Sequence, residues 1–237
     1  MIAANLLARY RGAALATLCT AVLAFAAAPA AWAASDQQAL IDKAALTAER
    51  LLNDPERPTL RKYMARAKGV LVVPSLIKGG FIFGIEGGSG VLLARGEKGW
   101  SHPAFFTIGA GSFGIQAGIQ DSQAMLVIMT DKGLRAVIKR QFKLGVDVSA
   151  AIGPGDGIGA GAGVGGATTA GLGADIYSFS DTRGLFAGVS FEGAAIVTRE
   201  DWNRAYYGKD ATTSRIVLEG KAANKGADRL RRALIVK

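Results

Sequence analysis

Residues 69–94 read GVLVVPSLIKGGFIFGIEGGSGVLLA. Three runs of aliphatic and aromatic residues lie in this stretch, at 70–73, 81–85 and 91–94, and prolines or glycines separate them. Short apolar runs bounded by turn residues are typical of β-strands. Because the connections are too short for the crossovers that join parallel strands, the runs predict antiparallel neighbours.

The strand pattern continues to about residue 198. Residues 105–120 alternate as a long strand or hairpin, and residues 124–129 predict a buried strand. Strand character returns in three later stretches, at 145–152, 157–180 and 185–198. Glycine is frequent throughout, with 32 in the chain. We therefore expect an antiparallel, glycine-rich sheet over residues 69–198, curled into a barrel or half-barrel.

Two helices are expected before the strands, over about residues 36–68. Ser35–Gln38 has the pattern of a capping box, and apolar residues then recur at helical spacing to about residue 52. Pro58 suits the first turn of the second helix, and Gly69 suits its end.

Further helices are expected towards the C-terminus. Thr130 or Asp131 can cap a short helix that runs through Arg140 within the strand region. After the strands, one helix is expected over 198–208 and a basic helix over 227–234. They belong to a C-terminal helical part of about 199–237, in which residues 216–218 predict a short strand. The fold class is therefore α+β, with helices at the N- and C-terminal ends.

Residues 1–33 have the features of a cleaved signal peptide. Two arginines precede a charge-free apolar run at 12–28, and Ala31-Trp32-Ala33 offers small residues at a cleavage site. A retained membrane anchor is the alternative, but the run is short for a spanning helix. We expect an exported, periplasmic protein whose mature part, residues 34–237, is a single domain.

Every second residue from 157 to 165 is glycine. On a strand these glycines would share one face, and a face without side chains allows another group to approach closely. Two interpretations stay open. The face packs a helix or forms a barrel corner, or it is the floor of a groove for an acyl chain or headgroup.

Residues that make and break bonds are scarce. His102 is the one histidine, and Cys19, the one cysteine, lies in the signal segment, which excludes a Cys–His pair and a thiolate metal site in the mature chain. Glu86 and Glu192, each beside glycine, are the candidates for a carboxylate pair. Hydrogen bonds to turn amides or a lysine are the simpler interpretation of both. We expect no enzyme, no cofactor and no metal.

Residues 109–114 and 161–166 match the pattern G-x-G-x-x-G. A dinucleotide site needs a helix to begin at this motif, so that its amides face the pyrophosphate. After residue 114 the pattern keeps the period of a strand, and no Walker A motif is present. Nucleotide binding is therefore not expected.

The chain is basic, with 28 Lys and Arg against 19 Asp and Glu. Without Arg9 and Arg11 of the signal segment the net charge is +7. A nucleic acid partner is disfavoured by the export signal and by the absence of interleaved aromatic and basic residues. The candidate contacts to anionic headgroups are Arg61, Lys62, Arg66, Lys68, Lys78, Lys132, Arg135, Lys139, Arg140 and Lys143.

Several motifs follow one another in an informative order. Ala67-Lys-Gly-Val-Leu-Val-Val-Pro74 and Lys78-Gly-Gly-Phe-Ile-Phe-Gly84 come first, and Trp100-Ser-His-Pro-Ala-Phe-Phe106 lies in the middle. Gly184-Leu-Phe-Ala-Gly-Val-Ser-Phe-Glu-Gly193 and Asn203-Arg-Ala-Tyr-Tyr-Gly208 come last. In this order they resemble the SYLF domain family, a lipid-binding module whose eukaryotic members include actin-associated proteins.

The resemblance implies phospholipid or phosphoinositide binding without catalysis. For an exported bacterial chain, anionic phospholipid at a membrane surface is the expected partner. The family's membrane contact is attributed to an amphipathic N-terminal helix and basic patches, which by position are residues 36–52 and 61–68. Because this helix is only mildly basic, lipid contact is assigned to the lysines beside the strands and to the cluster at 132–143.

Two other functions stay open. The alternating strands would suit a structural envelope protein or a small outer-membrane barrel, although aromatic girdles are absent from the sequence. A carboxylate-based hydrolase that uses Glu86 and Glu192 is the other alternative.

Overall fold

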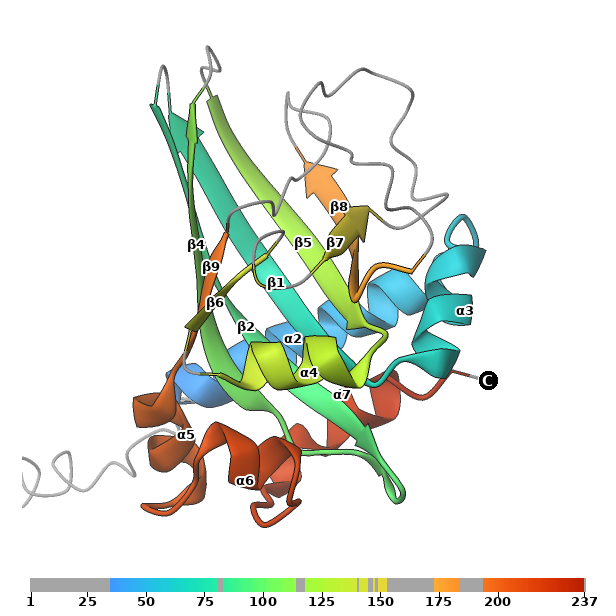
Figure 1. Ribbon diagram of the computed structural model, residues 1–237, viewed down its shortest axis with the longest axis vertical. Helices are drawn as coiled ribbons and strands as arrows, with labels where there is room; N and C mark the ends of the chain where they lie inside the picture. The colour runs from blue at the N-terminus through green and yellow to red at the C-terminus, as the bar shows by residue number, and fades with distance from the viewer. Residues whose placement is uncertain are drawn as a thin grey trace, which may run out of the picture. The chain divides into compact units, whose positions relative to one another are not determined.

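The fold is built on a nine-stranded sheet. The computed structural model describes residues 35–80, 83–113, 118–139, 141–144, 147, 149–152, 173–183 and 194–236. The strands are β1 (Gly69–Gly80), β2 (Phe83–Gly96), β3 (Gly99–Trp100), β4 (Ala104–Phe113), β5 (Gly118–Ile128), β6 (Gln141–Lys143), β7 (Ala150–Ile152), β8 (Ile176–Arg183) and β9 (Ala195–Thr198). Their spatial order is β6-β9-β4-β2-β1-β5-β8-β7, with β3 beside β2, and the sheet curls into a half-barrel (Figure 1).

The expected antiparallel pairing is confirmed for the long central strands. β1 pairs with both β2 and β5, and β4 lies on the other side of β2. One pair differs, because β7 runs parallel to β8. Residues 153–175 separate these two strands, which is long enough for the crossover connection that parallel strands require.

A β-bulge in β1 changes which residues face each side of the sheet. The register shifts between Val72 and Ser75 against β2. Before the bulge Val73 contributes to one hydrophobic cluster, and after it Leu76 contributes to the same cluster. The extra residue therefore reverses the alternation, so that Ser75 points to the opposite side of the sheet from Leu76.

Helices cover both faces of the sheet. They are α2 (Asp36–Asn53), α3 (Pro58–Arg66), α4 (Asp131–Ile138), α5 (Glu200–Tyr207), α6 (Thr213–Val217), the 3₁₀ helix η1 (Lys225–Ala227) and α7 (Asp228–Ala233). One hydrophobic cluster joins α2, α3 and α7 to the sheet. A second cluster joins α4 and α6 to the opposite face. Figure 1 shows α2 and α4 on opposite sides of the strands.

Helix α2 packs closely because its inward face is rich in alanine. Ile41, Ala44, Ala45 and Ala48 are fully buried, at the i, i+3, i+4 and i+7 spacing of a single helix face. Small side chains on this face let the helix backbone approach the strands.

One expected strand is a helix. Residues 216–218 were expected to be extended, yet α6 covers most of them. The Thr212 hydroxyl accepts a hydrogen bond from the Arg215 amide and so caps this helix. Burial of Ile216 and Val217 then outweighs the strand preference of β-branched residues.

Some expectations lie outside the described residues. These include the signal segment, the alternating glycines at 157–165, Arg140 and Glu192. Within the part of the chain that the structure describes, no helix is both long and apolar enough to cross a membrane.

Candidate functional site

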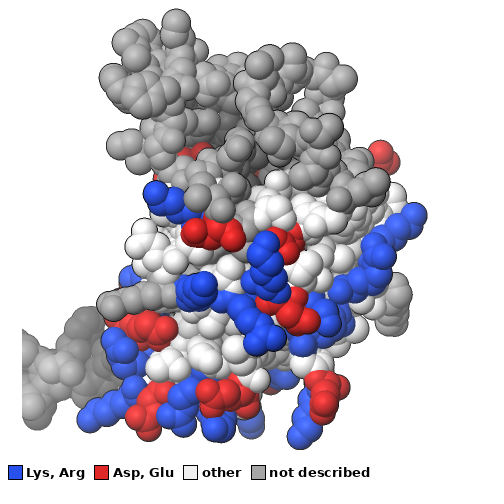
Figure 2. Space-filling model, in the orientation of Figure 1, with Lys and Arg blue, Asp and Glu red and all other residues white. Residues whose placement is uncertain are grey.

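Two basic segments of the sequence, residues 61–68 and 132–143, come together where α3 ends and α4 begins. The Lys68 amide donates to the Ile128 carbonyl at 2.8 Å, and Lys68 Nζ lies 3.8 Å from the Asp131 carboxylate. This places the C-terminal end of α3 beside the N-terminal end of α4. Figure 2 shows Lys and Arg side chains on this face of the molecule, with acidic side chains among them.

Three of the expected lipid-binding residues are engaged within the protein. Arg61 donates to the carbonyl oxygens of Leu52 and Asp54 at 3.1 and 2.8 Å, so it satisfies the C-terminal end of α2. Lys68 is the ion-pair partner of Asp131 already described. Lys132 Nζ lies 3.2 Å from an oxygen of Asp175. Each of these three side chains therefore has a partner within the protein, although those of Lys68 and Lys132 remain exposed.

Four other cations are exposed on the two helices, and we call them the α3–α4 basic surface: Lys62, Arg66, Arg135 and Lys139. Among the described residues none of the four has a carboxylate partner, although the Arg66 guanidinium lies 5.9 Å from the Tyr63 ring. Residues 58–68 contain no acidic residue, and residues 131–139 contain only Asp131. The surface therefore has a local excess of positive charge.

The remaining expected contacts lie away from these four. Lys143 is exposed in β6. The backbone of Lys78 lies in β1, where it pairs with Glu86 of β2. The side chain of Lys78 and all of Arg140 lie outside the described residues.

A buried carboxylate that the sequence analysis missed positions α4. Asp175 accepts hydrogen bonds from Thr130 Oγ1 at 2.6 Å, from Ser149 Oγ at 2.8 Å and from Lys132. Burial opposes ionisation of Asp175, but these hydrogen bonds outweigh it and lower its pKa to about 2. Thr130 also caps α4 by accepting from the Gly133 amide at 2.9 Å, as the sequence predicted.

The residues considered for catalysis or nucleotide binding in the sequence are Glu86, Glu192, His102 and the first glycine motif. Glu86 is buried in β2, and Glu192, the other candidate for a carboxylate pair, lies outside the described residues. His102 Nδ1 accepts a hydrogen bond from the Asn224 amide at 3.4 Å. Burial, together with the positive charge of Arg231, lowers the pKa of His102. Residues 109–113, the start of the first glycine motif, are part of strand β4 rather than the beginning of a helix.

Comparison with known proteins identifies relatives of the chain. It is 33% identical over 171 residues to SH3 domain-containing YSC84-like protein 1 of Xenopus laevis, a match that covers 71% of this chain and 49% of that protein. It is 33% identical over 160 residues to Protein YSC84 of Saccharomyces cerevisiae, covering 67% of this chain and 33% of the relative. An SH3 domain-containing protein of Schizosaccharomyces pombe is 35% identical over 173 residues, with 72% and 39% covered.

The chain thus spans half or less of the length of these relatives. No solved structure matches it. Residues 109–235 match the model of a family described as Ysc84, Las17-binding protein actin regulator. That description, and the name of a further relative, LAS seventeen-binding protein 3 of Saccharomyces cerevisiae, refer to binding or regulation rather than to catalysis. The chain therefore belongs to the Ysc84 family, the SYLF domain that its motifs resemble.

Proposed function

We propose that this domain binds anionic phospholipid membranes in the bacterial envelope, without catalysing a reaction, and that the α3–α4 basic surface makes the contact. One observation carries the proposal. Four exposed cations lie on two adjoining helices and have no carboxylate partner among the described residues. Cations that are not neutralised within the protein are free to pair with phosphate groups.

The size of the effect fits peripheral, reversible binding. Each Lys or Arg near an anionic membrane contributes about 1 kcal/mol. Four together contribute roughly 4 kcal/mol, which supports docking but not permanent anchoring. Because the attraction is electrostatic, it weakens as the Debye length shortens at higher salt.

Cosedimentation with vesicles tests the proposal. The protein is mixed with vesicles of phosphatidylcholine alone or with added phosphatidylglycerol, at low and high salt. A quadruple variant replaces Lys62, Arg66, Arg135 and Lys139 by Glu. The matched control replaces four exposed cations elsewhere by Glu: Lys98, Arg204, Lys209 and Lys225.

The two variants have the same net charge, so only the position of the cations differs. We expect the surface variant to bind anionic vesicles at least about a hundredfold more weakly. The control variant should retain most of its binding. Vesicles of phosphatidylcholine alone should bind none of the three proteins. Equal losses in both variants, or wild-type binding that is insensitive to salt, would contradict the proposal.

The family description favours a second candidate, in which the same surface contacts an acidic protein of the actin cytoskeleton type. Sedimentation of the wild type and both variants with actin filaments, in the absence of lipid, separates this candidate from the first. Loss of filament binding in the surface variant, with vesicle binding intact, would favour the protein partner.

A further inference from the structure

A groove with a volume of about 340 Å³ lies between α2 and the sheet. Helix α2 contributes one stripe of side chains to it, at positions i, i+3, i+4 and i+7: Lys43, Leu46, Thr47 and Arg50. Strand β1 contributes Pro74 and Ser75, at the bulge, and β5 contributes Asp121 and Gln123. None of these residues belongs to the α3–α4 basic surface.

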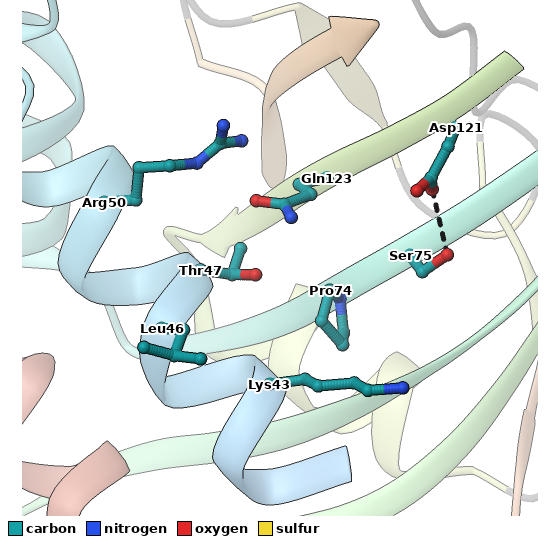
Figure 3. Close-up of a pocket in the computed structure, with 8 residues that line it drawn as sticks. All are labelled: Lys43, Leu46, Thr47, Arg50, Pro74, Ser75, Asp121 and Gln123. Atoms are coloured by element: carbon teal, nitrogen blue, oxygen red, sulfur yellow. Dashed lines mark hydrogen bonds between the residues drawn. The ribbon is translucent and has the colours of Figure 1, made fainter. Parts of the chain in front are cut away.

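The groove carries charges of opposite sign on opposite sides. Lys43 extends from α2 along one side, and Asp121 projects from β5 on the other (Figure 3). Asp121 accepts a hydrogen bond from Ser75 Oγ at 2.9 Å, which fixes one oxygen of the carboxylate, and no other partner of this carboxylate lies among the described residues. Among the described residues Lys43 has no carboxylate partner.

The other cation of the groove is already neutralised. Arg50 Nη2 lies 2.5 Å from an oxygen of Asp181 in β8. The other lining residues named in Figure 3 are uncharged: Thr47, Ser75 and Gln123 are polar, and Leu46 and Pro74 are apolar. Within the part of the chain that the structure describes, the lining charges without an ion-pair partner are therefore one ammonium and one carboxylate.

We infer that this groove binds a small zwitterion, with its phosphate or carboxylate on Lys43 and its primary ammonium on Asp121. A simple anion would be attracted by Lys43 but repelled by Asp121, and a simple cation would meet the reverse arrangement. A zwitterion satisfies both groups. The volume is at the lower end of the range of about 300–1,000 Å³ for ligand pockets, so the bound part is small.

Phosphoethanolamine has this chemistry, either as a free molecule or as the headgroup of a phospholipid. Its ammonium has three N–H donors for the Asp121 carboxylate. Phosphocholine has the same charges, but its quaternary ammonium has no N–H donor. Comparison of the two therefore separates hydrogen bonding at Asp121 from charge attraction alone.

Titration of the amide NMR spectrum of the protein with O-phosphoethanolamine tests the inference. We expect saturable shifts confined to α2, β1 and β5, with weaker binding of phosphocholine and of inorganic phosphate. Lys43→Gln and Asp121→Asn should each weaken binding by roughly tenfold, since each removes one charge-assisted hydrogen bond. Lys98→Gln, which removes an exposed lysine outside the groove, is the matched control and should bind like the wild type.

The spectra also show whether each variant is folded, because amides outside the groove should keep their wild-type positions. Absence of saturable shifts, or binding that Asp121→Asn leaves unchanged, would overturn the inference. Inorganic phosphate that binds as tightly as phosphoethanolamine would also overturn it, since the groove would then be an anion site.

Vesicles of phosphatidylethanolamine in phosphatidylcholine distinguish the two sources of the ligand. Binding that Asp121→Asn weakens would assign the groove to a lipid headgroup, and binding of only the soluble compound would assign it to a free zwitterion. These vesicles carry no net charge, and the Lys43 and Asp121 variants leave the α3–α4 basic surface intact. The experiments can therefore contradict the proposal for the groove without contradicting the proposal for the basic surface, and the reverse.

Discussion

The indole Nε1 of Trp100 donates a buried hydrogen bond of 3.0 Å to the carbonyl oxygen of Leu234. In the opposite direction, Arg231 Nε of α7 donates a hydrogen bond of 2.9 Å to the carbonyl oxygen of Trp100. The C-terminal helix is thus fastened to the short strand β3 at two points through a single residue. Because α7 also packs on α2 within the same hydrophobic cluster, this attachment closes one face of the sheet.

Replacement of Trp100 by Phe should therefore destabilise the domain. The aromatic ring is retained in part, but the Leu234 carbonyl loses its donor in a buried position. We expect the free energy of unfolding to fall by about 1–3 kcal/mol in urea titrations. Hydrogen exchange of the α7 amides should accelerate. Trp202→Phe is the control, since Trp202 is half-buried and its ring lies 3.6 Å from the Arg199 guanidinium. Equal losses in both variants would show that ring size, not the hydrogen bond, is responsible.

Stability should also depend on the protonation of His102. Burial lowers the pKa of its imidazole, and the positive charge of Arg231 lowers it further, although Asp228 acts in the opposite direction. Tyr207 faces the ring at 6.4 Å, and the Asn224 amide donates to Nδ1. The folded state therefore prefers the neutral imidazole.

The unfolded chain takes up a proton near pH 6.5, before the folded chain does. The free energy of unfolding should therefore decrease as the pH falls through this value, and level off once the folded imidazole is also protonated. His102 is the one histidine of the chain, so His102→Gln should remove most of this dependence. Urea unfolding of both proteins between about pH 7.5 and 5.5 measures it. Parallel curves for the two proteins would contradict the assignment.

The elements with strong local signals could be predicted from the sequence. Helix α2 and the central strands follow from residue periodicity, and the cap of α4 follows from Thr130. The α6 segment was misread because Ile216 and Val217 favour strands locally, whereas their burial against the sheet decides their conformation. The parallel pairing of β7 with β8 depends on partners brought together by a long connection, so no local pattern indicates it.

The candidate site shows the same limit. Sequence spacing identified the basic residues of α3 and α4, but it could not separate available cations from engaged ones. Arg61 is taken up by carbonyl groups of the preceding helix, and Lys132 by Asp175, 43 residues away. The groove was not foreseen, because α2, β1 and β5 each supply only a few of its residues. Ordinary polar residues such as Ser75 and Asp121 carry no motif.

Asp175 should make the stability of the domain sensitive to acid. Its pKa of about 2 in the fold is below the value of 3.8 expected without its hydrogen-bond partners. Its ionised form therefore stabilises the fold fully above about pH 4, and this contribution of about 2 kcal/mol is lost as the pH falls towards 2.

Asp175→Asn should lower the free energy of unfolding at neutral pH by roughly 2–3 kcal/mol, because the bonds from Thr130, Ser149 and Lys132 lose their charged acceptor. Unfolding followed by circular dichroism from pH 7 to 2 compares the two proteins. The difference between them should shrink below about pH 4, where the wild type also loses its carboxylate. A difference that stays constant down to pH 2 would indicate that packing rather than charge is responsible. Asp210→Asn, at an exposed position, is the matched control.

A side chain at Gly226 would displace the ends of two neighbouring side chains, Gln38 and Tyr206. An added Cβ would clash with the side-chain carbonyl oxygen of Gln38 and lie 2.6 Å from the Tyr206 hydroxyl. Gln38 Nε2 donates to the Gly226 carbonyl at 3.0 Å, and the Tyr206 hydroxyl donates to Gln38 Oε1 at 2.6 Å. Gly226→Ala must therefore displace Gln38 and break the links between α2, α5 and the C-terminal segment. We expect a loss of about 1–3 kcal/mol.

Gly96→Ala is the matched control, because a Cβ there would meet only the Gly99 carbonyl at 3.7 Å. Its effect should stay within about 0.5 kcal/mol. In a double-mutant cycle, Gln38→Ala removes the clashing side chain, so the loss caused by Gly226→Ala should be smaller in the Gln38→Ala background than in the wild type. Additive losses would show instead that Gly226 is required for its backbone alone, and that Gln38 and Tyr206 hold the C-terminal segment independently of it.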